Sequence, residues 1–420
     1  MMTVPASHLA RAALDAGEGI LRLAPAWVPR AFLHPGRRLR LAEEDLYALG
    51  VDRGGIDERW LSSCVVADNP GAPADEGLSY IVHEGCRCTL RDAVADLGAA
   101  LLGPEVWNRY GRWPVFGKFF DNMGPIPHHL HQDDVLAALV GREGKPEAYY
   151  FPPQLNPVGN SFPYTFLGLE PGVTKADVRR CLERWNCGDN GILDLSRAVR
   201  LTPGTGWLIG PRILHAPGSL LTFEPQWASD VFAMFQNLVE DRFVPWDLLV
   251  KDVPAERRSD LDFIVDLIDF PANTDPEFRK HHFLTPRLAD GGPEVHFADR
   301  WVVYGKINGR QLFTAKELTI EPGHKVVIRD NGCYGLVVTQ GVGRIGAPGS
   351  ASPARGGHAK LPLECPTLIR YGQLTLDEVF VSADRAREGV EFENTSHSEP
   401  LVTLRYFGPE VNPQAPTVAG

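Results

Sequence analysis

Three histidines and one glutamate are spaced so that they could hold a metal ion. His129 and His131 stand two residues apart in the segment Pro127–Asp134. If this segment is a strand, both imidazoles leave the same face of a sheet. Glu147 and His215 follow at strand-compatible places. Such a set suits a divalent first-row metal with positions open for water or substrate. A His-x-His pair alone is more often a surface or core feature than a pair of ligands, so the prediction depends on all four residues.

Composition and charge exclude several classes of protein. Of the 420 residues, 44% are hydrophobic, and 42 Gly and 35 Pro are spread along the chain, which is typical of short strands joined by turns. A net charge of -11 without a basic stripe argues against a nucleic acid or anionic membrane as partner. No apolar run approaches the roughly 20 residues of a membrane helix. The first 29 residues lack the charged start and apolar core of a signal peptide. The seven dispersed Cys are typical of reduced thiols. We therefore expect a cytoplasmic protein.

The chain divides into strand-rich and helical parts. Strand-like patterns dominate residues 51–240 and 291–420, whereas residues 241–290 are helical in pattern and residues 1–50 form an N-terminal helical or extended segment. Two strand-rich blocks around a small helical connector predict a mainly β fold with two sandwiches or barrels. We expect the first block to carry the metal site and the second to lack a complete one.

Helices are expected where a capping residue precedes an apolar periodicity. Thr89 and Thr174 are each followed by Asp three residues later, which is typical of a helix N-terminus. In the connector, apolar side chains at helical spacing follow Asp260, and the Phe270-Pro271 pair is expected to end that helix. Asp133 and its neighbour are interpreted as a cap for the next helix or as hydrogen-bond partners of the imidazoles.

Several segments, in their order and spacing, resemble type I phosphomannose isomerases. These metal-dependent cupin enzymes interconvert mannose 6-phosphate and fructose 6-phosphate. The resemblance covers roughly residues 55–240 well and 290–407 loosely. Its segments are Glu58–Leu61, Pro114–Asp121, Pro127–Asp134, Gly144–Tyr150, Phe166–Thr174 and Ile209–Ala216. The fifth is nearly a literal copy of the family's Phe-x-Gly-Leu-x-Pro-Gly-Val segment.

The resemblance implies a bicupin, which consists of two jelly-roll β-sandwich domains. It also implies one divalent metal ion held by His129, His131, Glu147 and His215. The family commonly has Gln at the first of these positions, so His129 is a departure. Zn or Mn is expected, and Fe, Co and Ni also suit such ligands.

The function implied is an aldose–ketose isomerase acting on a small carbohydrate. Such an enzyme moves a proton next to a carbonyl through an enediol or enediolate. We expect Lys145 and Lys118 to handle the proton or to stabilise the developing oxyanion, and a nearby divalent cation to draw a lysine pKa toward neutral. For either lysine, a salt bridge is the alternative interpretation.

One departure from the family pattern bears on the reaction. Met234 stands where the family carries an Arg thought to support the enediolate. Arg212, close to the last candidate ligand, could replace that charge or could be an ordinary charge at the end of a strand. The missing Arg favours an alternative reaction at the same site, namely elimination or epimerisation of an oxidised or unphosphorylated sugar. A cupin dioxygenase using Fe and a non-catalytic sugar-binding bicupin are further alternatives.

Overall fold

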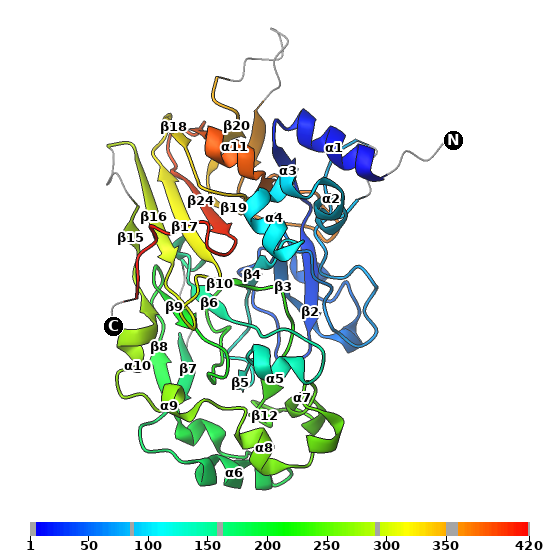
Figure 1. The fold of residues 1–420 in the computed structure, drawn as a ribbon, viewed down its shortest axis with the longest axis vertical. Coiled ribbons are helices and arrows are strands. Elements are labelled where there is room, and N and C mark those ends of the chain that lie inside the picture. The colour runs from blue at the N-terminus through cyan, green and yellow to red at the C-terminus, as the bar shows by residue number, and fades with distance from the viewer. Residues whose placement is uncertain (1–5, 85–87, 158–162, 290–294, 350–359, 419–420) are drawn as a thin grey trace.

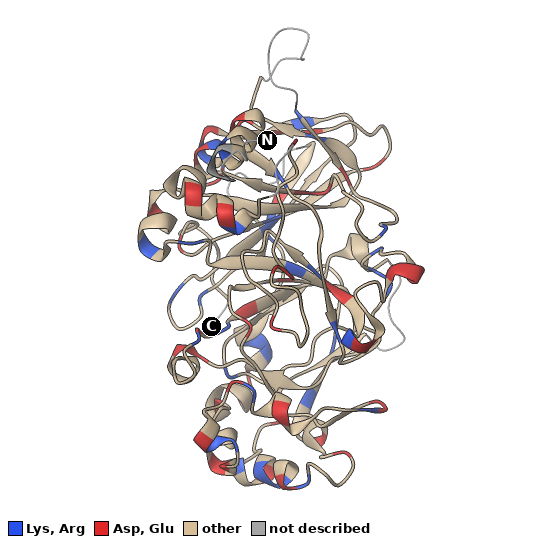
Figure 2. Cartoon of the chain, turned by 90° about the vertical axis from the view of Figure 1, so that its right-hand side faces the viewer, with Lys and Arg blue, Asp and Glu red and all other residues tan. Residues whose placement is uncertain are grey.

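The computed structural model describes residues 6–84, 88–157, 163–289, 295–349 and 360–418 (Figure 1). Its fold is mainly β, as predicted, and two seven-stranded antiparallel sheets form its two halves. Helices α6, α8 and α9 gather at one end of the elongated molecule (Figure 1). Basic and acidic residues are interspersed along the described chain (Figure 2). Among the described residues, no helix combines the length and apolar character needed to cross a bilayer.

The first sheet carries Glu147 and Lys118 of the candidate site. In spatial order its strands are β14 (Phe283–Leu284), β9 (Gly206–Ile209), β6 (Glu147–Tyr150), β10 (Thr222–Trp227), β4 (Val115–Phe120), β3 (Gly55–Leu61) and β2 (Ala26–Arg30). Three two-stranded ribbons accompany it: β5 (His129–Leu130) with β11 (Ala233–Met234), β7 (Tyr164–Leu169) with β8 (Ser196–Arg200), and β12 (Leu238–Val239) with β13 (Arg242–Phe243). The strands of the first sheet are almost entirely buried, so polar side chains on them need partners inside the protein.

The second half is a sandwich of a seven-stranded and a four-stranded sheet. The larger sheet has the order β1 (Ile20–Arg22), β22 (Glu378–Val381), β19 (Tyr334–Gln340), β24 (Leu401–Phe407), β17 (Thr314–Ile320), β16 (Phe297–Val303) and β15 (Arg287–Leu288). The smaller has the order β18 (Lys325–Ile328), β23 (Val390–Asn394), β20 (Val342–Gly346) and β21 (Leu361–Glu364). One hydrophobic cluster joins residues of both sheets. Within residues 1–50, β1 pairs with β22 of the second half and β2 pairs with β3 of the first.

The helices are short and lie outside the sheets. They are α1 (Ala6–Ala16), α2 (Leu90–Leu97), α3 (Ala99–Leu102), α4 (Pro104–Tyr110), α5 (Asp134–Ala138), α6 (Lys175–Glu183), α7 (Trp246–Leu249), α8 (Leu261–Val265), α9 (Phe270–Asn273), α10 (Phe278–His282) and α11 (Ala383–Glu388). Single 3-10 turns span Glu43–Asp45, Val51–Arg53, Pro153–Leu155, Ile192–Leu195 and Ala255–Arg257. Both predicted caps are confirmed, since Thr89 and Thr174 form capping boxes at α2 and α6.

The connector differs from its prediction. The expected helix after Asp260 is α8, which ends at Val265. The Phe270-Pro271 pair then begins α9 instead of only ending a helix, and Asp269 caps it by accepting from the Ala272 N–H at 3.2 Å. Proline fits there because its missing N–H would have no partner in a first helical turn. The apolar pattern therefore continues across two helices.

The two large sheets place charged residues at corresponding positions. In the first, Lys118 on β4 lies opposite Glu224 on β10. In the second, Lys316 on β17 lies opposite Arg405 on β24. Both cations of the second pair contact Asp330, and the Lys316 nitrogen lies 2.9 Å from its carboxylate. The second half thus buries an ion-pair network, whereas the candidate metal-binding group found among the described residues lies in the first half.

Candidate metal centre

Two neighbouring segments bring the three predicted histidines together. His129 and His215 exchange backbone hydrogen bonds of 2.9 and 2.8 Å, which aligns their segments in antiparallel fashion. His131 follows β5 in extended chain, so its ring leaves the same side as that of His129. The centroid of the His129 ring lies 5.1 Å from that of the His131 ring and 4.2 Å from that of the His215 ring. One nitrogen from each ring lies within 4.8 Å of the others, and all three residues are buried.

The backbone sets the tautomer of each imidazole. Nδ1 lies 2.7 Å from the Pro127 carbonyl in His129, 2.6 Å from the Val231 carbonyl in His131, and 2.7 Å from the Ile213 carbonyl in His215. A carbonyl oxygen only accepts, so each Nδ1 carries its hydrogen. Nε2 then keeps its lone pair toward the centre of the group. This is the tautomer and orientation that metal-binding histidines have.

Glu147 completes the group from β6. Its carboxylate oxygens lie 2.9 Å from Nε2 of His131 and 3.1 Å from Nε2 of His215. Both partners of each contact are acceptors, and His215 Nε2 is buried without a hydrogen-bond partner. Acceptors that face one another need a cation between them. The donor set therefore fits a divalent metal ion, and Tyr149 further orients the carboxylate by donating to it.

A cavity opens beside His129 and His131. Lys145 lines this cavity and contacts two candidate ligands, with Nζ 3.1 Å from His131 Nε2 and 3.2 Å from Glu147. Lys118 also lines the cavity, with Nζ 3.1 Å from Glu224 and 3.3 Å from Glu58. Both lysines named from the sequence thus lie beside the candidate ligands, and both are paired with carboxylates.

The protein groups around Lys118 favour its charged form. Burial opposes its charged form, but Glu224, Glu58 and Glu147 outweigh burial and raise the pKa of Lys118 above its ordinary value. From protein groups alone, Lys118 is therefore a firmly charged ammonium. Burial, followed by the charge of Glu147, raises the pKa of Glu224 to about 8, although Lys118 and Lys145 oppose the rise.

Arg212 is the one predicted site residue that belongs neither to the group of four candidate ligands nor to the lining of the cavity. Its backbone has a φ of 65°, and its guanidinium donates to the carbonyls of Asp266 at 2.8 Å and Leu267 at 3.1 Å. The same group lies 3.4 Å from Asp133, whose carboxylate caps α5. Its contacts thus join α5 to the end of α8.

Met234 lies opposite His129 in the β5–β11 ribbon and lines the cavity.

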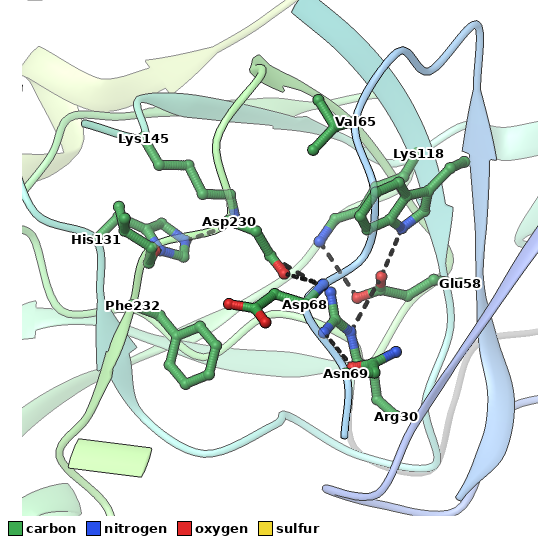
Figure 3. Close-up of polar contacts among 12 residues, drawn as sticks. Arg30, Glu58, Val65, Asp68, Asn69, Lys118, His131, Lys145, Asp230 and Phe232 are labelled. Carbon is green, nitrogen blue, oxygen red and sulfur yellow. Dashed lines mark hydrogen bonds and ion pairs between the residues drawn. The ribbon is translucent and has the colours of Figure 1, made fainter. Parts of the chain in front are cut away.

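Sequence reasoning missed Arg30. This residue ends β2, is buried, and lines the cavity together with Glu58 and Asp230. Its guanidinium lies 3.4 Å from each of these two carboxylates and donates to Asn69 at 2.8 Å (Figure 3). Glu58 stood within a segment that resembles the family, but Arg30 had no local signal. Its position follows from the pairing of β2 with β3, which joins distant parts of the chain.

Comparisons with known proteins rest on structure alone. No family model matches the sequence, and no curated protein sequence matches it. Solved structures match over nearly their whole length. A protein of Archaeoglobus fulgidus assigned as a mannosephosphate isomerase has a TM-score of 0.60 at 14% identity, with 93% of this chain and 97% of that chain covered. The mannose 6-phosphate isomerase of Bacillus subtilis has a TM-score of 0.58 at 15% identity, with 92% and 99% covered. A zinc-bound mannose 6-phosphate isomerase has a TM-score of 0.58 at 14% identity, with 93% and 99% covered. The chain therefore has the cupin-type fold of the phosphomannose isomerases, as its sequence predicted.

Proposed function

We propose that this protein is a metal-dependent sugar isomerase that transfers a proton next to a carbonyl group. The observation that carries the proposal is the convergence of three imidazole Nε2 atoms and the Glu147 carboxylate beside a polar cavity. Zinc is the proposed ion, because nitrogen and carboxylate donors suit it and because a zinc-bound mannose 6-phosphate isomerase has the same fold. The proposed ligands are His129, His131, Glu147 and His215.

The cavity residues supply the groups that an enolisation needs. A divalent ion in this site would act as a Lewis acid on the carbonyl and adjacent hydroxyl oxygens of a sugar. The Lys145 ammonium, next to the candidate ligands, can donate a hydrogen bond to an oxygen that becomes negative. Lys118 adds a second fixed positive charge on the same wall. Arg212 has no part at the reacting carbon in this scheme, because its guanidinium is bonded outside the cavity.

A carboxylate on the cavity wall is the proposed base. Glu58 and Asp230 both line the cavity. Glu58 is held by Trp60 at 2.7 Å as well as by Lys118 and Arg30. The cavity-facing contact of Asp230 is a longer one, 3.4 Å to Arg30. Asp230 therefore has fewer close partners than Glu58 and is the proposed acceptor of a proton from a substrate carbon.

Uptake of deuterium from heavy water tests this function. The zinc-loaded protein is incubated with a panel of aldoses and ketoses and their phosphate esters, and deuterium at each carbon is read by NMR. We expect exchange at C2 of an aldose together with formation of the ketose. His131→Ala should abolish exchange, whereas His281→Ala, at an exposed histidine on α10, should not. The proposal would be refuted if exchange persisted in His131→Ala. It would also be refuted if no sugar in the panel showed exchange.

One observation favours a second reaction at the same site. Met234 puts an apolar side chain on the cavity wall opposite His129. An enediolate that lacks a guanidinium there could instead lose a substituent or be reprotonated on its other face. Deuterium at a carbon other than C2, or at C2 without ketose, would identify elimination or epimerisation.

A further inference from the structure

We propose that the sugar accepted at this site carries no phosphate and is recognised through its hydroxyl groups alone. This inference rests on the proposed function and specifies its substrate class. The observation behind it is that each cation lining the cavity, among the described residues, is already paired with a buried carboxylate. Figure 3 shows the contacts of Arg30 and Lys118 with Glu58. A phosphate dianion needs cations whose charge is free to meet it.

Arg30 is the cation with the geometry to clamp a phosphate, but its donors are committed. Nε faces Glu58 at 3.4 Å, one terminal nitrogen faces Asp230 at 3.4 Å, and the other donates to Asn69 at 2.8 Å. Both carboxylates are buried. Pulling the guanidinium toward a phosphate would leave these charges unpaired inside the protein, which is strongly unfavourable.

The two lysines are committed in the same way. Lys118 bridges Glu58 and Glu224 at 3.3 and 3.1 Å. Lys145 contacts Glu147 at 3.2 Å and lies 3.9 Å from Glu224, so it keeps an acidic neighbour even when Glu147 serves a metal ion. Each lining cation among the described residues thus already has at least one buried acidic side chain within 3.4 Å.

The acids on the wall would repel a phosphate directly. Burial raises the pKa of Asp230, but Arg30 and then Lys251 outweigh burial and hold it well below its usual value, so the group is ionised at neutral pH. Lys251 packs on the Phe232 ring at 4.3 Å and is itself paired with Asp68 at 3.0 Å. The negative charges of Asp230 and Glu58 therefore face the cavity beside Arg30 and Lys118.

The same walls suit a neutral polyhydroxy compound. A sugar hydroxyl both donates and accepts, and each carboxylate–cation pair offers an acceptor beside a donor. Phe32 and Phe232 also line the cavity, with ring centroids 6.5 Å apart and planes nearly perpendicular. Together with Met234 they form an apolar surface against which the C–H face of a sugar can pack.

Matched pairs of free sugars and phosphate esters test the inference. Deuterium exchange is measured with the zinc-loaded protein for mannose, glucose and fructose and for their 6-phosphates, and inorganic phosphate is added as a competitor. We expect kcat/KM to favour the free sugar in at least one pair, with no competitive inhibition by phosphate. Preference for the esters in every active pair, or competitive inhibition by phosphate, would overturn this inference while leaving the isomerase proposal intact. Exchange with neither class would refute both.

A charge variant tests the physical reason separately. Glu58→Gln keeps an oxygen that can accept from Trp60 but removes one of the charges that neutralise Arg30 and Lys118. Binding of mannose 6-phosphate to the zinc-loaded variant, measured by calorimetry, should strengthen by about tenfold or more relative to the wild type. Equal zinc content in both proteins shows that the site has folded. Unchanged binding with intact zinc content would contradict the charge argument.

Discussion

Tyr149→Phe should weaken metal binding although Tyr149 is not itself a candidate ligand. Its hydroxyl donates to the Glu147 carboxylate, and its ring packs 6.1 Å from the His215 ring, centroid to centroid. Phenylalanine keeps the ring and removes only the donor. Loss of such an outer hydrogen bond typically costs 10- to 100-fold in metal affinity, about 1.4 to 2.7 kcal/mol. Competition with a chromophoric chelator at neutral pH would measure the zinc dissociation constants of variant and wild type.

The next residue in the strand provides a matched control. Tyr150 is equally buried on β6, but strand alternation directs it to the opposite face, where its hydroxyl donates to Glu317 on β17 at 2.9 Å. Tyr150→Phe should cost about 0.5 to 1.5 kcal/mol of stability and leave zinc affinity unchanged. The reasoning fails if Tyr149→Phe binds zinc as tightly as the wild type, or if both variants weaken binding equally.

Further predictions concern stability. Arg59→Met should lower the free energy of unfolding in urea by about 3 to 5 kcal/mol, because it leaves the buried carboxylates of Asp377 and Glu378 without their cation. Arg37→Met, at an exposed ion pair, should cost less than about 1 kcal/mol. Similar losses in the two variants would contradict this reasoning. Burial raises the pKa of Glu378 to about 7 although Arg59 opposes it, so the stability contributed by this group is complete below its unfolded pKa of about 4.5 and is lost as pH rises through about 7. Between those values the wild type should lose more stability than Glu378→Gln, and parallel pH profiles would refute the assignment. A metal ion at 100 times its dissociation constant should stabilise the wild type by about 2.7 kcal/mol, and a chelator should remove that increment from the wild type but change nothing in His131→Ala.

Local chemistry explains what the sequence could predict. Thr89 and Thr174, each followed by Asp three residues later, predicted the starts of their helices. The capping contact between the two side chains forms within one helical turn, so it can be recognised from adjacent sequence. The alternation of side chains along extended chain was enough to direct His129 and His131 to one side. The segments that resemble phosphomannose isomerases supplied the partner residues, Glu147 and His215, and the bicupin fold.

Long-range pairing and backbone conformation explain what it could not predict. Arg30 reaches the cavity because β2 pairs with β3, although the N-terminal segment carried no pattern that separates β1 from β2. The interpretation of Arg212 assumed that a residue near a ligand directs its side chain to the site. A left-handed φ and two carbonyl acceptors near the end of α8 direct it elsewhere. Neither feature has a local signature in the sequence.

Anomalous diffraction from zinc-loaded crystals tests the central claim most directly. A map computed from data collected at the zinc absorption edge locates the ion without assumptions about function. We expect a single strong peak about 2.0 to 2.2 Å from Nε2 of His129, His131 and His215 and from a carboxylate oxygen of Glu147. A zinc-loaded crystal with no peak among these four side chains, or with its peak elsewhere, would contradict the metal centre and the isomerase proposal built on it.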